Sequence, residues 1–243
     1  MCRETCYRCF WPKAHCWCNR RVPMHTVTRF ILLMHPKEFR REKAGTGRLT
    51  HLSLPNSEIV QGVEFDRSPR IQALLNDPSL QVVLLYPGVE AVNLSSEGAD
   101  VRTLIPEGRT VVVLVLDATW SCARKLLKLS PSLQRLPRIM FTPSAPSRFV
   151  IKQQPMLGCL STLESVHEVL QALDARGVEK YERPTQLLEL FSTMQQFQIE
   201  CAEDPDQGGY RRGPYQAPGE RTPFKGQSAR RRANFFKVGG TGC

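Results

Sequence analysis

Long apolar runs are missing from this sequence of 243 residues. No stretch approaches the roughly 18 uncharged apolar residues of a membrane-spanning helix, so we expect no membrane partner. The first residues, MCRETCYRCFWPK, contain no apolar core followed by a small-residue cleavage site, which excludes a secretory signal. We therefore expect an intracellular, cytoplasmic protein.

Several catalytic signatures are absent as well. The sequence contains no Walker loop, no G-x-S-x-G elbow, no H-E-x-x-H pair and no internal repeat. Sequence support is therefore lacking for P-loop, α/β-hydrolase and zincin chemistry. The length suits one domain of about 200 residues with appendages, and the apolar fraction of 41% is ordinary for a globular protein.

Acidic residues are scarce, with 23 carboxylates against 33 lysines and arginines and a net charge of +10. Residues 207–243 hold eight basic residues and one glutamate, so this segment carries +7 of the excess. It is rich in glycine, proline and arginine and shows no periodicity, which predicts a disordered basic tail over residues 204–243. The charge points to an anionic partner, usually nucleic acid, although a tail can also serve solubility alone.

Five of the nine cysteines lie in the first 18 residues. The pattern Cys6-x2-Cys9-x6-Cys16-x-Cys18 can place four thiolates tetrahedrally around Zn²⁺, and the lack of a secretory signal argues against disulfides. An iron–sulfur cluster is the main alternative, because it also takes four thiolates. Four thiolates leave no open position for water, so we expect a structural metal that supplies folding energy to an otherwise poorly apolar segment.

The stretch Thr110–Leu129 combines a strand with a helix. Six aliphatic residues end in Asp117, which is typical of a central strand in a covered parallel sheet, and helical spacing begins at Trp120. Asp117-Ala118-Thr119-Trp120 is then a strand-to-helix turn, the place where α/β sheets bind ligands. The alternative is that Asp117 or Thr119 only caps the helix and that Trp120 belongs to the core.

Further segments predict an α/β fold with a central, mainly parallel sheet flanked by helices. We expect strands at Thr28–Met34, Gln81–Tyr86 and Arg138–Thr142, and helices over residues 161–177 and 184–199. Residues 44–49 are expected to form a glycine-flexible turn, followed by a short strand at Leu52–Leu54.

Basic residues surround that expected turn. Arg40, Arg41, Lys43 and Arg48 could grip phosphates there, although a solvated helix face would have the same composition. A second candidate anion site is the helix start at Ser161, where Ser161-x-x-Glu164 forms a capping box. Its free backbone N–H groups suit a carboxylate or a phosphate, while the two side chains are explained by capping alone.

Together these separated motifs resemble the DTW-domain family of tRNA-uridine aminocarboxypropyltransferases. The motifs that carry the resemblance are the four cysteines, His35-Pro36-x-Glu38 with the Thr46-Gly47 turn, Leu85-Tyr86-Pro87-Gly88, Asp117-x-Thr119-Trp120, Pro143-Ser-x-x-Ser147 and Leu160-Ser-Thr-Leu-Glu164. They span roughly residues 1–200 in the expected order. Ala118 departs from the glycine of many members, and the basic tail has no counterpart that we can match.

The resemblance implies a SPOUT-like α/β domain, a class in which the cofactor pocket is formed by knotted loops. It divides the chain into a zinc-binding segment (1–23), a DTW domain that binds S-adenosylmethionine (24–203) and the basic tail (204–243). The implied reaction moves the 3-amino-3-carboxypropyl group of S-adenosylmethionine to N3 of a uridine in tRNA and releases methylthioadenosine. No protein partner is implied.

The resemblance also suggests roles for individual residues. Asp117 is the expected base or orienting group. It opens the D-x-T-W motif, which consists of Asp117, Ala118, Thr119 and Trp120. The expected S-adenosylmethionine contacts are Tyr86, Pro87, Gly88, Leu160, Ser161, Thr162, Leu163 and Glu164. The expected RNA contacts are Arg40, Arg41, Lys43, Arg48, Trp120, Ser147 and Arg148. Two alternatives use the same residues: a SPOUT-type RNA methyltransferase, and a non-catalytic zinc-containing RNA-binding module.

Overall fold

One parallel sheet organises the chain. The computed structural model describes residues 4–41, 45–99, 101–152, 154, 158–204 and 216–220, without the side chains of Arg41, Arg102, Thr103 and Pro218. Its strands are β1 (Arg29–Met34), β2 (Ser57–Gln61), β3 (Leu80–Leu85), β4 (Val92–Asn93), β5 (Thr110–Asp117) and β6 (Arg138–Met140). They pair in the order β2-β1-β5-β3-β6-β4, and each neighbouring pair in this order is parallel. The predicted α/β class with a parallel central sheet is confirmed.

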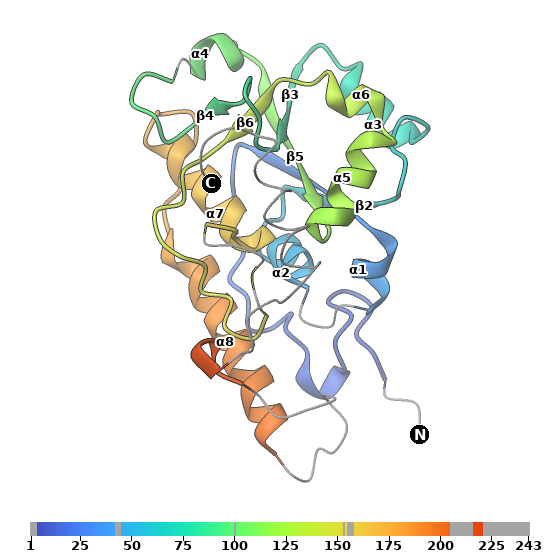
Figure 1. Cartoon of the computed structure of the whole chain (residues 1–243), viewed down its shortest axis with the longest axis vertical. Helices are drawn as coiled ribbons and strands as arrows, with labels where there is room; N and C mark the ends of the chain where they lie inside the picture. The colour runs from blue at the N-terminus through green and yellow to red at the C-terminus, as the bar shows by residue number, and fades with distance from the viewer. Residues whose placement is uncertain are drawn as a thin grey trace.

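Helices cover both faces of this sheet (Figure 1). They are α1 (Pro36–Arg41), α2 (Thr46–Ser53), α3 (Pro69–Leu75), α4 (Val101–Leu104), α5 (Trp120–Lys128), α6 (Pro131–Gln134), α7 (Thr162–Asp174) and α8 (Thr185–Glu203), with short 3₁₀ turns at Lys13–His15 and Pro218–Glu220. Apolar residues of α2, α7 and α8 form one core with one face of the sheet. Residues of α3, α5 and α6 form a second core on the opposite face. The result is a three-layer arrangement.

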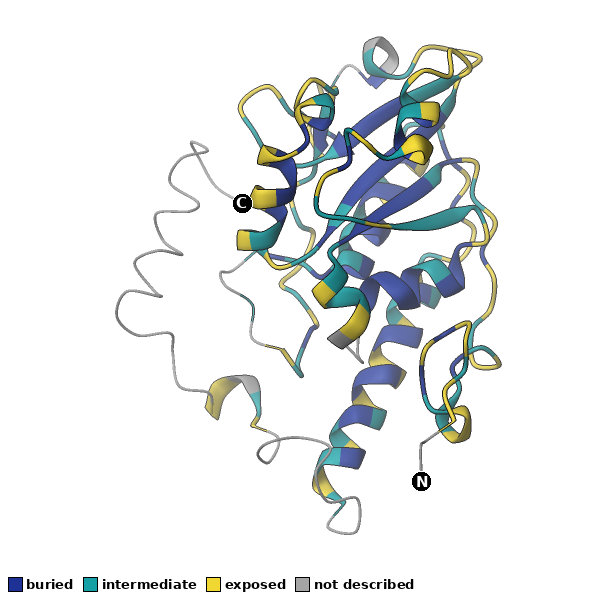
Figure 2. Ribbon diagram, turned by 90° about the vertical axis from the view of Figure 1, so that its right-hand side faces the viewer, coloured by how far each residue is buried: buried dark blue, intermediate teal, exposed yellow. Residues whose placement is uncertain are grey.

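Strand β5 lies in the middle of the sheet, between β1 and β3. Its side chains alternate: Val113 and Val115 enter the core beneath α2 and α7, whereas Val112 and Leu114 enter the other. Figure 2 shows the middle of the sheet buried between the helical layers, while the edge strand β2 is mostly of intermediate burial. Because side chains on a strand repeat every second residue, Asp117 follows Val115 onto the α2 and α7 face. The side chain of Asp117, the last residue of β5, therefore lies at the C-terminal end of the strand, beneath α2 and α7.

The expected turn at residues 44–49 and the expected strand at Leu52–Leu54 are wrong, because Thr46–Ser53 forms helix α2. Glycine and hydroxyl side chains weaken a helical pattern, which misled the prediction. Here the Thr50 hydroxyl donates to the Thr46 carbonyl oxygen at 2.8 Å, so a buried hydroxyl is satisfied within the helix. Burial of Leu49 and Leu52 in the core then stabilises the helix.

The N-terminal segment is packed onto α8 by aromatic rings. Trp11 and Trp17 lie 5.4 Å apart between centroids, and each lies within about 6 Å of Phe197 in α8, at 5.8 and 6.0 Å. Trp17 is only 1% exposed and belongs to the same core as α7 and α8. The segment therefore has apolar anchors that composition alone did not reveal, in addition to its cysteines.

The C-terminal prediction concerns residues that are mostly not described. Of the expected disordered tail, 204–243, only residue 204 and residues 216–220 lie within the described ranges. Among the helices of the described residues, none combines the length and the apolarity needed to cross a bilayer.

Glu179 joins the end of the α7 region to the start of β1. Its carboxylate accepts hydrogen bonds from the backbone N–H groups of Val27 and Thr28, at 2.9 and 2.7 Å, and its side chain is 6% exposed. We expect Glu179→Ala to lower the free energy of unfolding by about 2–4 kcal/mol, because two backbone donors, one of them buried, lose their partner. Glu182→Ala is the matched control, since Glu182 is a surface residue paired with Lys180. Urea unfolding of both variants tests this, and equal stabilities would contradict it.

Candidate functional site

Asp117 lies at the carboxyl end of β5, where two helices begin. Its Oδ1 accepts a hydrogen bond from the Thr162 hydroxyl at 2.6 Å, at the first residue of α7. Its backbone oxygen accepts from His35 N at 3.1 Å, which extends the pairing of β1 with β5. The carboxylate is 8% exposed. The N-cap of α5 is Thr119, without a capping side-chain bond, so the alternative of Thr119 as a side-chain cap is not supported.

Helix α2 approaches the same carboxylate so closely that only glycine fits. A Cβ atom on Gly47 would lie 2.2 Å from Asp117 Oδ2, far inside van der Waals contact. The Thr46-Gly47 motif is therefore explained by close packing against Asp117. Motif residues that are 45 or more positions apart in the chain thus meet at one carboxylate.

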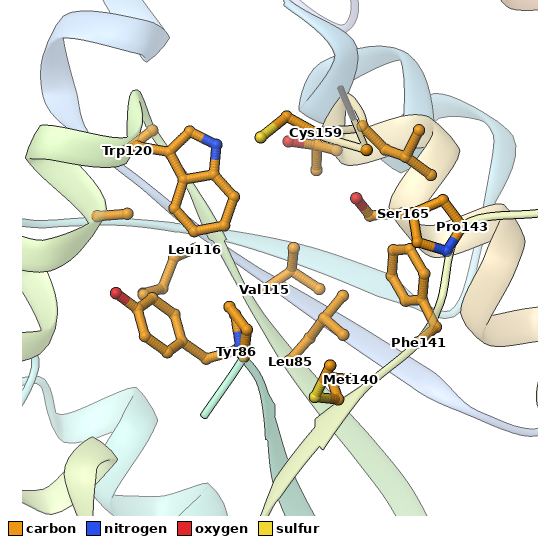
Figure 3. A pocket seen from close by; sticks show the side chains of 16 residues that line it. Leu85, Tyr86, Val115, Leu116, Trp120, Met140, Phe141, Pro143, Cys159 and Ser165 are labelled. Carbon is orange, nitrogen blue, oxygen red and sulfur yellow. The ribbon is translucent and has the colours of Figure 1, made fainter. Parts of the chain in front are cut away.

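A cavity of about 150 Å³ opens next to Asp117, between the ends of β3, β5 and β6 and the start of α7. Leu116, Ala118 and Thr162 line it, so both chain neighbours and the hydrogen-bond partner of Asp117 reach it. Figure 3 shows Trp120 and Tyr86 on one side, Phe141 and Pro143 on the other, and Val115 between them. Cavities of about this volume accommodate one aromatic ring.

Half of the expected S-adenosylmethionine contacts line this cavity, namely Tyr86, Pro87, Leu160 and Thr162. Gly88, Ser161, Leu163 and Glu164 are not among its lining residues. Trp120, expected to contact RNA, does line it, and its ring centroid lies 6.3 Å from that of Tyr86.

Sequence reasoning missed several wall residues. These are Val115, Leu116, Ala123, Met140, Phe141, Gly158, Cys159 and Ser165; Leu85 and Pro143 also line the cavity and stand in the motifs quoted above, but no contact was expected of them. Most are apolar residues at strand ends or in loops, where no local pattern separates a cavity wall from ordinary core. The position of a residue just after a predicted parallel strand was the one usable signal.

Glu164 holds the loop 143–148 against the start of α7. The predicted capping box is confirmed: the Ser161 hydroxyl accepts from Glu164 N at 3.3 Å, and Ser161 N donates to Glu164 Oε2 at 2.8 Å. Glu164 also accepts from the Ser147 hydroxyl at 2.9 Å and from Arg148 N at 2.5 Å. Ser147 and Glu164 therefore bind each other, which fixes the loop that leads from the cavity wall.

The expected RNA contacts fall into different environments. Arg40 and Arg148 are exposed, whereas Arg48 is buried, with 9% of its surface exposed. Lys43 and the side chain of Arg41 lie outside the described residues. Burial lowers the pKa of the Arg48 guanidinium, and the nearby charges of Asp117 and Cys9 raise it.

The four predicted metal ligands come together. All four sulfurs of Cys6, Cys9, Cys16 and Cys18 lie within 4.8 Å of one another, with 3.8 Å between Cys6 and Cys18 and 3.7 Å between Cys9 and Cys16. Four thiolates at about 2.3 Å from a tetrahedral Zn²⁺ would be about 3.8 Å apart, so the donor set fits this ion. Such a metal would stabilise the segment and would leave no position for a reacting water.

Backbone N–H groups lower the pKa of the Cys6 thiol, which favours the thiolate that binds a metal. The N–H groups of Cys9 and Arg8 lower the pKa of Cys6 to about 6, because they donate to its thiolate. Burial raises the pKa values of Cys9 and Cys18, the latter to about 12. A bound cation would offset this cost of burying thiolates. Among the described cysteines, all are free thiols.

Comparison with known proteins gives a consistent set of matches. A family model described as DTW domain matches residues 3–199. The chain is 30% identical over 183 residues to tRNA-uridine aminocarboxypropyltransferase 2 of Drosophila melanogaster, covering 72% of this chain and 68% of that protein. It is 28% identical over 210 residues to the Macaca fascicularis protein of the same name (83% and 68%), and 26% identical over 225 residues to tRNA-uridine aminocarboxypropyltransferase A of Arabidopsis thaliana (81% of each). No solved structure matches.

The cysteine cluster makes a direct prediction about metal content. We expect the purified protein to carry one equivalent of zinc by elemental analysis, and Cys16→Ser to lose most of it, because three thiolates bind more weakly than four. Cys122→Ser is the matched control, since Cys122 lies outside the cluster, in α5. Zinc-free wild-type protein, or full zinc content in Cys16→Ser, would contradict the assignment, and stoichiometric iron with sulfide would support the cluster alternative.

Proposed function

Because the chain belongs to the DTW domain family, we propose that it is a tRNA-uridine aminocarboxypropyltransferase. It moves the 3-amino-3-carboxypropyl group of S-adenosylmethionine to N3 of a uridine in tRNA and releases methylthioadenosine. The observation that carries the proposal is the meeting of Asp117, Thr162 and a ring-sized apolar cavity at the carboxyl edge of a parallel sheet. This edge is where α/β folds bind their ligands.

The donor substrate suits the apolar cavity. Tyr86, Pro87, Leu160 and Thr162 line it, and their mostly apolar surface matches a purine ring with its thioether. We assign the polar start of α7 to the amino acid end of the donor, since the backbone N–H groups of a helix N-terminus favour a carboxylate. Gly88, Ser161, Leu163 and Glu164 then support the site through the loops and the helix cap that shape it.

The reaction forms a bond between uridine N3 and the γ-carbon and breaks the bond between that carbon and sulfur. The bonding electrons return to sulfur, which leaves as a neutral thioether, so no general acid is required. The N3 proton must be removed. The Thr162 hydroxyl donates to Asp117 and lines the cavity, so its oxygen can accept the N3 proton while its own proton passes to Asp117. Asp117 thus orients Thr162 and receives the proton.

Transfer RNA would approach over the exposed rim of this edge. Arg40 and Arg148 are exposed and suit phosphate contacts. Trp120 lines the cavity that we assign to the donor, so its indole either packs beneath the site or stacks on a flipped uracil with the face that the purine leaves free. Lys43, Arg41 and the basic residues of 207–243 would add an attraction that salt weakens. Ser147 acts through the loop that it fastens to Glu164.

Three broader assignments belong to the same proposal. We place the domain in the SPOUT class, with a knotted chain at the cofactor pocket, as the family resemblance implies; the parallel sheet with a cavity at its carboxyl edge is compatible with that class. We divide the chain into the zinc-binding segment 1–23, the catalytic domain 24–203 and the basic tail 204–243. We assign the protein to the cytoplasm, whose reducing conditions suit the free thiols of the described cysteines.

Product analysis tests the reaction directly. We expect the purified protein, incubated with S-adenosylmethionine and unmodified tRNA, to release methylthioadenosine in amounts equal to the 3-amino-3-carboxypropyluridine found by mass spectrometry of the digested tRNA. Ribosomal RNA serves as the comparison acceptor. Release of S-adenosylhomocysteine with methylated nucleoside would identify a methyltransferase, and tRNA binding without either product would identify a non-catalytic RNA-binding module; both contradict the proposal.

The paired roles of Asp117 and Thr162 make a second test. We expect Asp117→Asn and Thr162→Val each to lower kcat by about a hundredfold or more, because the proton loses its path, with tRNA affinity kept. Thr162→Ser should stay close to wild type, since it retains the hydroxyl. Asp77→Asn is the charge-matched control: the Asp77 carboxylate accepts hydrogen bonds from the Ser79 backbone N–H and hydroxyl, and Asp77 precedes β3 at the opposite edge of the sheet. Wild-type kcat in Asp117→Asn would remove Asp117 from this role.

A further inference from the structure

Arg48 is a buried cation held between two aromatic rings. Its Cζ lies 4.5 Å from the centroid of Phe10 and 4.4 Å from that of Phe39, and the residue is 9% exposed. Its Nε is buried and has no hydrogen-bond partner. Two aromatic rings therefore contact this guanidinium, as in cation–π pairs. It is therefore poorly placed to reach a phosphate of a docked RNA.

The same arginine is the chain neighbour of the residue that packs against the strand-end carboxylate. It follows Gly47, whose Cα packs against Asp117 with no room for a Cβ. Asp117 is close enough for its charge to oppose the effect of burial on Arg48. The positive charge of Arg48 attracts the Asp117 carboxylate and so resists its movement away from α2. Gly47 and Asp117 are in close contact, so a displacement of Arg48 that moves Gly47 would also displace Asp117.

Phe10 belongs to the cysteine segment, and the cysteine turn sets its position. Phe10 N donates to the carbonyl oxygen of Cys6 at 2.7 Å, and Cys6 N donates to that of Trp11 at 2.7 Å. Phe10 also has φ +60°, a left-handed conformation that is costly for a residue other than glycine. The ring of Phe10 meets Phe39 of α1 edge to face at 4.9 Å. The turn that gathers the thiolates thus also holds one side of the aromatic pair around Arg48.

We propose that Arg48 is a positioning residue for Asp117 and that the four-cysteine segment holds Arg48 in place through Phe10. The segment would then do more than stabilise the N-terminus, because the geometry at the end of β5 would depend on its integrity. This inference deepens the proposed transferase function and, for its kinetic consequences, rests on it. It assigns Arg48 to the support of the site and removes it from the RNA contacts.

Paired substitutions at Phe10 separate stacking from packing. We expect Phe10→Leu, which keeps an apolar side chain but loses the ring face, to lower kcat by about ten- to a hundredfold with KM for S-adenosylmethionine and tRNA within twofold of wild type. Phe10→Tyr restores a ring and should recover kcat to within about threefold. Zinc content should be unchanged in both. Arg48→Met should resemble Phe10→Leu, because it keeps the length of the side chain and loses the charge.

Phe197→Leu is the matched control. It removes the aromatic contacts of α8 with Trp11 and Trp17, on the part of the segment that does not touch Arg48. We expect a lower Tm with wild-type kcat. Wild-type kcat in Phe10→Leu, or an equal loss in Phe10→Leu, Phe10→Tyr and Phe197→Leu, would overturn the proposal, because the effect would then be general destabilisation.

A spectroscopic measurement tests the link without activity. In the zinc-loaded wild-type protein, the Arg48 Nε–H resonance, assigned from its absence in Arg48→Met, should be shifted by ring currents and protected from solvent exchange. Removal of zinc with a chelator should move it to the position of exposed arginines, while amide signals of β1, β3 and β5 stay dispersed. An unchanged Arg48 signal after zinc removal would overturn the proposal. If the wild type releases no methylthioadenosine, the proposed function fails instead, and this measurement still decides the structural link.

Discussion

A carboxylate buried at the end of the central strand constrains much of the surrounding structure. Burying a charge is costly unless hydrogen bonds and opposite charges compensate for the lost water. Around Asp117 this compensation includes the hydrogen bond from the Thr162 hydroxyl at the start of α7 and the nearby charge of Arg48. The close approach of α2 requires glycine at position 47. The identities of residues in several separate motifs are thus explained by their contacts with the buried Asp117 carboxylate.

The parallel sheet makes this arrangement rigid. Val113 and Val115 pack beneath α2 and α7, while Val112 and Leu114 pack beneath α3, α5 and α6, so β5 cannot shift its register without exposing apolar side chains. The carboxyl end of β5 is consequently fixed relative to both helical layers. Precise placement of a reacting group on such an element supports catalysis better than placement on a free loop.

Local patterns predicted the parts of the fold that depend on neighbours in sequence. The aliphatic run before Asp117, the capping box at Ser161 and the cysteine spacing are short signals with direct physical causes, and the structure confirms the strand, the cap and the cysteine cluster. Helix α2 was missed because the reason for Gly47 lies 70 positions away, at Asp117. The cavity wall formed by Met140, Phe141 and Cys159 was missed because it exists only after distant segments pack together. Arg48 was expected at the surface, since its aromatic neighbours come from two other segments.

The backbone conformation of Phe10 has a consequence for protein engineering. Methods that raise stability often place glycine at left-handed positions, which relieves about 1 kcal/mol of strain. At position 10, where φ is +60°, such a design would be scored as an improvement and would remove the ring that faces Arg48. A more stable protein with a slower reaction would result. The unfavourable torsion of Phe10 therefore lowers folding stability but keeps in place the ring that holds Arg48 near the Asp117 carboxylate. Sequence optimisation of this chain should leave Phe10 unchanged.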